Sequence, residues 1–342
     1  MDVDYFIVGA GLAGASTGYY LKQRTRTTSE AAPRVVVVEK EELPGVHSSG
    51  RNASQIRRHV DDHAIAELVR RGADVLVKGQ LAEFHRTGSV LIGRGSDDAS
   101  AHFPMARGQG LWCPDDGVID VAGLLSTYLG DLDVRYGTEV TGWDDAPRSA
   151  GSPTAAVRCP LRVHTNHGDI DTGVLINAAG AWAGILGKLP LTPTNRHLFI
   201  TPPTEAVRPD WPYVWDVPNG LYFRPESGGL LLCACDESPA EPGCYDEDQE
   251  VAARLEELVR TLQPGLGEIR IMRSWVGQRT FAADRRFVIG YDPRDRRIFH
   301  VAGLGGYGVS TAPAVGALAA DMLLDESGSG PHNPFDPARL LE

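Results

Sequence analysis

The stretch "DYFIVGAGLAGASTGYYL", residues 4–21, decides how this chain begins to fold. Its apolar residues 5–8 predict a short buried strand, and the pattern from about Leu12 onward predicts a helix. Between the two, glycines in G-x-G-x-x-G spacing allow a tight turn, a close backbone approach to a pyrophosphate, and close packing of helix against strand. Free N–H groups at the helix amino terminus also favour phosphate. We therefore predict a dinucleotide site that includes Gly9, Ala10, Gly11, Leu12, Ala13 and Gly14.

A second strand, in "RVVVVEK" (residues 34–40), supports this prediction. It ends at Glu39, where a carboxylate can accept hydrogen bonds from both ribose hydroxyls of a dinucleotide. The gap between Gly14 and Glu39 exceeds the usual ~20 residues. The polar loop "RTRTTSEAAP" (residues 24–33) accounts for the excess, because a surface loop can lengthen at little thermodynamic cost.

The succession of strand, glycine-rich turn and helix returns in "RIFHVAGLGGYGVSTAPAVGALAADML" (residues 297–323). A tight strand-to-helix connection would explain these glycines by itself, but a second helix amino terminus would also suit an electron-rich group. In "GVLINAAGAWA" (residues 173–183) an apolar strand runs into small residues, which suits backbone that passes close to a ligand. Both stretches favour a flavin dinucleotide.

Length, charge and cysteine usage exclude several classes of protein. A chain of 342 residues is long for one hydrophobic core, so we expect two closely packed domains. The formal net charge of −12 argues against a general nucleic-acid or anionic-membrane surface. No apolar run approaches the ~20 residues of a membrane span, and no basic n-region of a secretory signal precedes the first strand. Five irregularly spaced cysteines make a poor disulfide framework, so we expect a reducing, cytoplasmic location.

No metal site is expected. Cys233 and Cys235 would share one face of a strand, but no histidine or second cysteine pair lies close in sequence. Buried small side chains are therefore the expected role of these two residues.

Several segments, in the order in which they occur, carry a resemblance to a known family. They are "VGAGLAGAS", "VVVVEK", "PGVHSSGRNAS", "GTEVTGW", "NAAGAWA", "VPNGLYFRPESGG", "SWVGQRTFAADRRFVIGYDP" and "VAGLGGYGVSTAPAVGALAADML". Together they span almost the whole chain. The sequence resembles the D-amino-acid oxidase-like superfamily of FAD-dependent amine oxidoreductases, and within it the D-arginine dehydrogenases and monomeric sarcosine oxidases.

The resemblance implies an α/β (α+β) fold, in which a Rossmann-type FAD-binding domain packs intimately against a substrate domain built on an antiparallel sheet. We expect residues 1–80, 130–190 and 285–342 to form the FAD-binding domain. Residues 81–129 and 191–284 would form the substrate domain. The turn signal Pro218-Asn219-Gly220 independently predicts antiparallel strands between Tyr213 and Cys235.

The resemblance also implies which further residues contact FAD. The segment after the second strand would wrap the flavin, and the second glycine-rich turn would face its ring. The implied contacts are Lys40, His47, Ser48, Ser49, Gly50, Asn52, Ala53, Ser54, Val140, Ala178, Ala179, Gly180, Trp182, Arg279, Gly303, Gly305, Gly306, Tyr307, Gly308, Val309, Ser310 and Thr311.

Noncovalent FAD is expected. In related dehydrogenases a histidine in the position of His47 can be bonded to the flavin, but the nearest members bind FAD without a bond. The sarcosine oxidases use a cysteine in the strand that matches "SWVGQRTF" (residues 274–281), and no cysteine occurs there.

Three residues match those that act on the substrate in the amino-acid members. Arg279 matches the arginine that clamps the substrate carboxylate, a task that suits the planar guanidinium fork. Tyr222 matches a tyrosine whose hydroxyl joins that clamp, and Arg196 matches a further active-site arginine. Further substrate contacts are expected from Gln55, Arg58, Tyr213, Trp215 and Gly306.

The sequence also departs from the family pattern. No acid lies near Gly88 and Ser89, where D-arginine dehydrogenase binds the distal guanidinium, so D-arginine is a doubtful substrate. Residues 93–112 are much shorter than the usual helical insertion, which would leave a more open cavity or a docking surface for a protein partner. The lysine that assists oxygen reaction in sarcosine oxidases is absent from "GGLLLCAC" (residues 228–235), which favours a dehydrogenase.

The expected reaction is oxidation of the C–N bond of an amino acid or related amine. Hydride would pass to flavin N5, the imine product would hydrolyse to an oxo acid, and oxygen or another acceptor would reoxidise the flavin. No side-chain base is evident, so the substrate would react as the free amine. Two alternatives remain: a flavin monooxygenase acting on a larger substrate, and a flavin-binding subunit that needs a partner.

Overall fold

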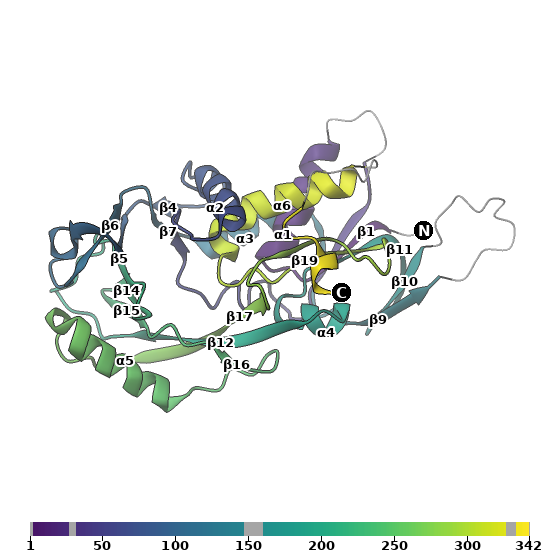
Figure 1. Ribbon diagram of the computed structural model, residues 1–342. Helices are drawn as coiled ribbons and strands as arrows, with labels where there is room; N and C mark the ends of the chain where they lie inside the picture. Colours follow the sequence, from purple (N-terminus) through teal and green to yellow (C-terminus); the bar gives the residue numbers. More distant parts are fainter. Residues whose placement is uncertain (1–2, 27–31, 147–159, 326–332, 342) are drawn as a thin grey trace, which may run out of the picture.

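Two large sheets and a layer of helices make up the computed structural model, which describes residues 3–26, 32–146, 160–325 and 333–341. Figure 1 shows helices α1, α2, α3 and α6 on one side and the long strands β12 and β17 on the other. Part of the polar loop 24–33, from 27 to 31, and Cys159 lie outside the described residues.

The first sheet has a parallel centre in the order β19-β11-β1-β2-β8. Strand β1 lies between β2 and β11, and Val8 pairs with both Val38 and Asn177. The carboxyl ends of these three strands therefore meet at one edge. The strands of this sheet are β1 (Val3–Val8), β2 (Val35–Val38), β8 (Asp133–Arg135), β9 (Val140–Asp145), β10 (Leu161–Thr165), β11 (Gly168–Asn177), β18 (Val288–Tyr291) and β19 (Ile298–Ala302).

Alternating side chains give the first sheet two buried faces. Ile7 of β1 packs into the core under the helices, whereas its neighbours Phe6 and Val8 pack into a second cluster on the opposite face. The short apolar run of β1 is thus buried on both sides, as is usual for a parallel strand. The helices are α1 (Leu12–Thr25), α2 (His63–Leu76), α3 (Val121–Leu129), α4 (Ala183–Gly187), α5 (Gln249–Leu262) and α6 (Gly308–Leu324).

Helices α1 and α6 pack in close contact above the first sheet. A Cβ atom at Gly316 of α6 would lie 2.6 Å from the backbone carbonyl of Ser16 in α1, so only glycine fits this crossing. The contact joins the amino-terminal half of α1 to the middle of α6.

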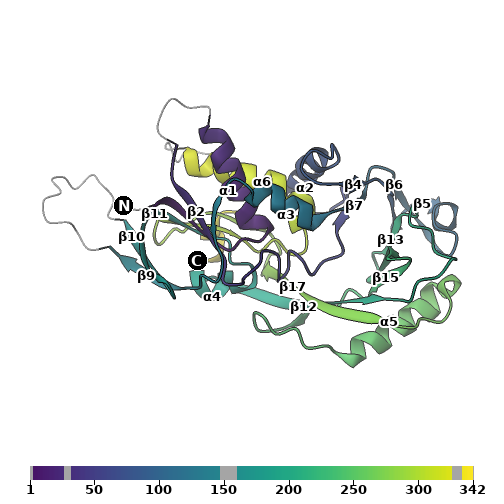
Figure 2. The same ribbon diagram turned by 180° about the vertical axis from the view of Figure 1, so that it is seen from behind.

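The second sheet is largely antiparallel, in the order β16-β12-β15-β14-β13-β5-β6, and β17 pairs with β12. Figure 2 shows β12 and β17 running from the first sheet to the region of α5. The prediction of antiparallel strands between Tyr213 and Cys235 is confirmed for β13 to β15. The strands are β5 (Ser89–Asp98), β6 (Gln109–Cys113), β12 (Leu191–Ile200), β13 (Tyr213–Asp216), β14 (Leu221–Glu226), β15 (Gly229–Cys233), β16 (Ser238–Pro239) and β17 (Arg273–Ala282).

A third sheet has three short strands in the order β3-β7-β4. In the chain, β3 and β4 precede β5 and β6, and β7 follows them. Its strands are β3 (Gln55–Ile56), β4 (Phe84–His85) and β7 (Gly117–Ile119). Residues 93–112, expected to be a shortened insertion, form the end of β5, a 3-10 turn at Ala99–Ala101 and the start of β6. Among the described helices, none combines the length and apolar character needed to cross a membrane.

The predicted fold class is confirmed, because a parallel, helix-covered sheet is joined to a separate antiparallel sheet. The proposed domain boundaries stay a prediction.

Candidate active site

Two cavities meet at the edge where β1, β2 and β11 end. The larger has a volume of about 710 Å³ and the smaller about 180 Å³. Both are lined by Gly11, Ser48, Ser49, Ala178 and Gly180, so a single elongated ligand can extend from one to the other.

The first glycine-rich turn forms the junction between the cavities. Gly9 has a φ of +105°, and a Cβ there would lie 2.6 Å from the carbonyl oxygen of Ala178. A Cβ at Gly14 would lie 2.0 Å from the carbonyl oxygen of Gly9, so a larger residue there would require the backbone to shift. Leu12 donates its N–H to Ser49 Oγ at 2.9 Å. The amino terminus of α1 therefore opens directly onto the cavities.

Glu39 lines the larger cavity immediately after β2. Its Oε2 accepts a hydrogen bond from Ala10 N at 3.0 Å, and its Oε1 accepts one from Glu41 N at 3.2 Å. A carboxylate has about four lone-pair sites, so two acceptor positions remain for a ligand's hydroxyl groups.

His47 belongs to a polar cluster on the wall of the larger cavity. Its Nδ1 lies 2.6 Å from Tyr245 Oη and its Nε2 lies 2.8 Å from Glu41 Oε1. Its ring also packs against Trp182, at 4.6 Å between centroids. The hydrogen bond with His47 lowers the pKa of Glu41. Both ring nitrogens are thus engaged within the protein.

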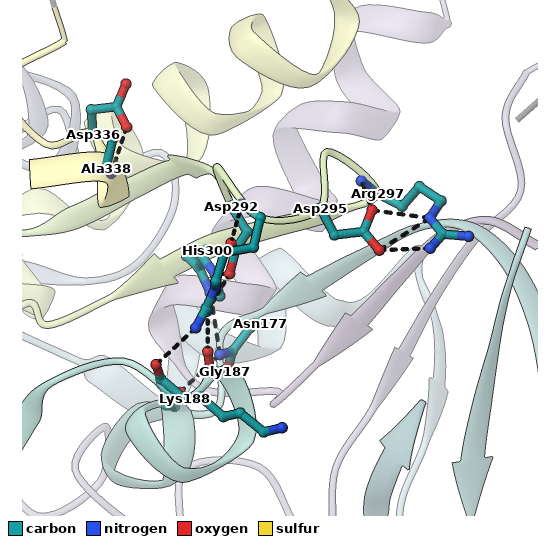
Figure 3. A network of polar contacts seen from close by, with 11 residues as sticks. Asn177, Gly187, Lys188, Asp292, Asp295, Arg297, His300, Asp336 and Ala338 are labelled. Carbon is teal, nitrogen blue, oxygen red and sulfur yellow. Dashed lines mark hydrogen bonds and ion pairs between the residues drawn. The ribbon is translucent and has the colours of Figure 1, made fainter. Parts of the chain in front are cut away.

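A second polar network, drawn in Figure 3, contributes Gly187, Asp292 and Arg294 to the lining of the larger cavity. His300 Nε2 lies 3.0 Å from Asp292 Oδ2, and its Nδ1 lies 3.3 Å from Asn177 Nδ2. Arg294 donates to the carbonyl oxygen of Gly187 at 2.6 Å and to Asp292. Burial alone would raise the pKa of Asp292, but its hydrogen bonds with Arg294 and His300 hold it well below its usual range. The network ties β19 and the loop after β18 to β11 and α4.

The smaller cavity lies between the start of α6 and the strands β12, β14 and β17. Arg196 of β12 donates to the carbonyl oxygen of Asp236 at 2.6 Å and to Glu237 at 2.8 Å. The backbone carbonyl oxygen of Arg279 in β17 accepts a hydrogen bond from Thr194 Oγ1, but its guanidinium has no hydrogen-bond or ion-pair partner among the described residues. Burial and the neighbouring Arg196 lower the pKa of Arg279, although a guanidinium stays protonated in proteins. Of these two arginines, Arg196 is therefore paired, and the guanidinium of Arg279 is available to a ligand.

Tyr222 and a cysteine pair lie next to these arginines. Burial raises the pKa of Tyr222 well above its usual value, so its hydroxyl stays a hydrogen-bond donor. Cys235 N lies 3.3 Å from Cys233 Sγ. Burial alone would raise the pKa of Cys233, but the hydrogen bond with Cys235 and the two arginines lower it to about 6. Within the described residues, no group of three His, Cys, Asp or Glu side chains could hold a metal ion.

Most of the predicted site residues line one cavity or the other. In the larger cavity these are Gly9, Gly11, Glu39, Lys40, His47, Ser48, Ser49, Val140, Ala178, Ala179, Gly180 and Trp182. In the smaller cavity they are Gly11, Leu12, Ala13, Ser48, Ser49, Asn52, Ala53, Ser54, Gln55, Ala178, Gly180, Arg196, Trp215, Tyr222, Arg279, Gly303, Gly305, Gly306, Gly308, Val309 and Ser310. Seven predicted residues are not part of either lining: Ala10, Gly14, Gly50, Arg58, Tyr213, Tyr307 and Thr311.

Two of those seven have partners elsewhere. Arg58 is directed away from the smaller cavity and donates to Asp74 at 3.2 Å and to the carbonyl oxygen of Asp115 at 2.6 Å. Tyr213 is buried, and its hydroxyl donates to Asp116 at 3.1 Å.

Arg57, which sequence reasoning missed, lines the smaller cavity instead of Arg58. Because side chains alternate along an extended chain, Arg57 is on the same face as Gln55. That alternation is the signal that could have identified it. Tyr245 was also missed, since nothing in its sequence neighbourhood indicates contact with His47.

Known proteins share the sequence pattern and the fold of this chain. The family model described as "DAO: FAD dependent oxidoreductase" matches residues 4–322. The FAD-dependent oxidoreductase domain-containing protein 1 of Bos taurus is 24% identical, over 94% of this chain and 81% of that protein. N-methyl-L-tryptophan oxidase of Salmonella agona is 22% identical over the whole of both chains. The crystal structure of L-proline dehydrogenase from P. horikoshii superposes with a TM-score of 0.83 at 20% identity, over 99% of this chain and 97% of that chain, which shows a shared fold.

Proposed function

This chain belongs to the DAO family of FAD-dependent oxidoreductases, and we propose that it oxidises the carbon–nitrogen bond of an amino acid or a related amine. When bound, FAD supplies a hydride acceptor at N5 of its ring. The contributions of the protein are to bind the cofactor, to hold the substrate carboxylate, and to keep the amine in its reactive form.

The residues present fit FAD. The turn at Gly9 and Gly11 leaves a cradle that side chains would fill, since a Cβ at Gly11 would lie 2.9 Å from Ser49 Oγ. The amino terminus of α1 suits the pyrophosphate, and the remaining acceptor sites of Glu39 suit the ribose hydroxyls. Gly308 to Ser310, at the start of α6, line the smaller cavity and would face the flavin ring.

The unpaired guanidinium of Arg279 is the observation that carries the proposal. An arginine can hold a carboxylate through two parallel hydrogen bonds, and no described side chain competes for those donors. Gly306 leaves room beside it, because a Cβ there would lie 2.8 Å from Arg279 Nε. The neutral hydroxyl of Tyr222 lines the same cavity and can add a third hydrogen bond.

The charges of the smaller cavity favour a neutral amine. Its described lining contains Arg51, Arg57, Arg196 and Arg279 but no Asp, Glu, His or Lys. Nearby cations disfavour a further positive charge, so a bound ammonium would lose its proton more readily than in water. We expect kcat/KM to rise with pH through the ionisation of the substrate amine. A flat profile would contradict this step.

A dehydrogenase type of turnover is part of the proposal. No lysine is found among the described residues that line the smaller cavity, and the resemblance links such a lysine to the reaction with oxygen. The imine product would leave and hydrolyse in water to an oxo acid.

The experiment that tests the function is an anaerobic absorbance titration of the FAD-loaded protein. A panel of D- and L-amino acids and N-methyl amino acids is added while the flavin absorbance is followed. Loss of the oxidised flavin band with one class of compound would support amine oxidation. A flavin that stays oxidised with every amine would contradict it.

A further inference from the structure

Three hydrogen-bond donors without acceptors belong to side chains that line the smaller cavity. The Nε2 atom of Gln55 and the Nε1 atom of Trp215 are buried and have no hydrogen-bond partner. The guanidinium of Arg57 makes no hydrogen bond or ion pair with any described residue. All three residues line the cavity. We refer to Gln55, Arg57 and Trp215 as the donor cluster.

The Arg57 side chain is held in place by two aromatic rings. Its guanidinium carbon lies 4.3 Å from the ring centroid of Trp215 and 4.5 Å from that of Tyr307. Its backbone N–H also donates to Ser310 Oγ at 3.2 Å, which fixes this segment to the start of α6. Stacking on aromatic faces leaves the in-plane N–H groups of a guanidinium free to donate. Arg57 is thus pre-organised for a ligand.

The donor cluster lies beside the carboxylate clamp that we propose at Arg279. Trp215 of β13 pairs across the sheet with Tyr222 of β14. Arg57 and Arg279 approach consecutive residues of the second glycine-rich turn, Tyr307 and Gly306 respectively. A small molecule in this cavity can therefore contact both arginines.

The chemistry of the donor cluster selects for an anion. Buried donors without acceptors are unfavourable, so they persist where a ligand satisfies them. All three members donate, and the described lining holds no acidic side chain to pair with them. An uncharged side chain of a substrate would leave the partly buried Arg57 charge without a counter-ion.

We propose that the substrate carries a second carboxylate and that the donor cluster binds it while Arg279 holds the first. The substrate class is an aminodicarboxylic acid or an amino acid with a carboxyalkyl group on its nitrogen. This inference rests on the proposed function for the identity of the first carboxylate. Arg57 acts as a specificity residue and takes no part in the transfer of hydride.

The test compares matched pairs of compounds on the FAD-loaded protein: aspartate with alanine, and iminodiacetate with sarcosine, each tested in both configurations where they exist. The wild-type protein is expected to favour the dicarboxylate of a pair in kcat/KM. In R57Q that preference should fall by about 10- to 100-fold, the effect of losing a charge-assisted contact. In W215F, which keeps an aromatic ring at this position but removes the indole N–H donor, the preference should fall by about two- to tenfold.

Arg58→Gln is the matched control. It removes the adjacent guanidinium, which is directed away from the cavity toward Asp74, and should leave the preference at the wild-type value. Flavin content and the thermal unfolding midpoint of each variant show that it has folded. Equal loss for both compounds of a pair in R57Q, or a wild-type protein that favours the monocarboxylate, overturns the inference.

A binding measurement separates this inference from the proposed function. Malonate and succinate cannot be oxidised as amines, but either can bridge two arginines and perturb the flavin absorbance spectrum. A perturbation that is lost in R57Q, together with no reduction by any amine, would support the second carboxylate site and overturn the proposed oxidation. Reduction by amines with no preference for dicarboxylates would support the proposed oxidation and overturn the second carboxylate site. If dicarboxylates neither bind nor react, the inference fails.

Discussion

The two cavities differ in the unpaired charge that they present to a ligand. At the larger one His47 pairs with Glu41 and Asp292 with Arg294, while the Glu39 carboxylate keeps acceptor sites for hydroxyl groups. In the smaller one Arg57 and Arg279 have no such partner among the described residues. The larger cavity suits a ligand that stays the same in every turnover. It offers that ligand backbone N–H groups and the space that glycine residues leave open. The smaller one offers unpaired charge, so its ligand must supply the complementary charge.

The largest effect is expected from filling the space that a glycine leaves open next to the larger cavity. In Gly14→Ala the new Cβ would lie 2.0 Å from the carbonyl oxygen of Gly9, so α1 must move away from β1. Overpacking of this kind costs about 1–3 kcal/mol, and more where backbone is the obstacle. We expect a lower unfolding midpoint and protein purified with little FAD, measured by thermal unfolding and by the ratio of flavin to protein absorbance.

Gly142→Ala is the control for this variant. Gly142 also lines the larger cavity, but no heavy atom lies within 4 Å of a Cβ built there. It should keep both FAD and stability. Equal flavin content in G14A and G142A would show that the close contact at Gly14 does not shape the site.

The second largest effect is expected from removing the unpaired charge of Arg279. In Arg279→Ala we expect KM for a carboxylate substrate to rise about 10- to 100-fold, because a charge-assisted hydrogen bond contributes about 1.5–3 kcal/mol. Flavin content should change little, which distinguishes this variant from Gly14→Ala. The measurement is steady-state kinetics with the amine that reduces the flavin most readily.

Arg279→Lys keeps the charge and loses the planar fork, so its KM should lie between those of the wild type and the alanine variant. An unchanged KM in Arg279→Ala would remove this residue from the carboxylate clamp.

A smaller effect is expected from Tyr222→Phe. The change removes one neutral donor and leaves the ring, so KM should rise about three- to tenfold with kcat nearly constant. Both parameters are read from the same kinetic assay as for Arg279. A fall in kcat with constant KM would assign Tyr222 to the transition state rather than to binding.

The sequence predicted the larger cavity better than the smaller one, for a physical reason. The glycines of a strand-to-helix turn are needed for its backbone geometry, which fixes their spacing in the sequence. The roles of Gly9, Gly11 and Gly14 could therefore be predicted from the neighbouring residues alone. Glu39 could be placed because it directly follows the continuous apolar run of β2. The resemblance added Arg279 and Tyr222, and the structure places both on the smaller cavity.

Side-chain direction in the segment after β3 could not be predicted with the same success. Whether Arg57 or Arg58 faces the cavity depends on the register of β3 against β7, in which Gln55 pairs with Val118. A shift of one residue reverses every side chain. Tyr213 illustrates the same point, because its burial depends on Asp116, far away in sequence, being there to accept its hydrogen bond.

The smallest effect is expected at a charge that the protein satisfies by itself, outside both cavities. Asp62 caps α2 by accepting hydrogen bonds from Ala64 N and Ile65 N, and it pairs with Arg286 at 2.8 Å. Burial alone would raise its pKa, but the hydrogen bond with Arg286 and those with the helix amides lower it. Asp62→Ala should therefore cost about 1 kcal/mol of unfolding free energy at neutral pH.

The lowered pKa of Asp62 fixes the sign of its pH dependence. A carboxyl whose folded pKa is below its unfolded value stabilises the protein above the unfolded pKa, and that stability is lost as pH falls through the folded pKa. The difference in unfolding free energy between wild type and Asp62→Asn should thus shrink in acid. Chemical unfolding at neutral pH and in acid measures it, and a difference that grows in acid would contradict the pairing. Because Asp62 presents no unpaired group to either cavity, FAD content and KM should stay at wild-type values, in contrast to Gly14→Ala and Arg279→Ala.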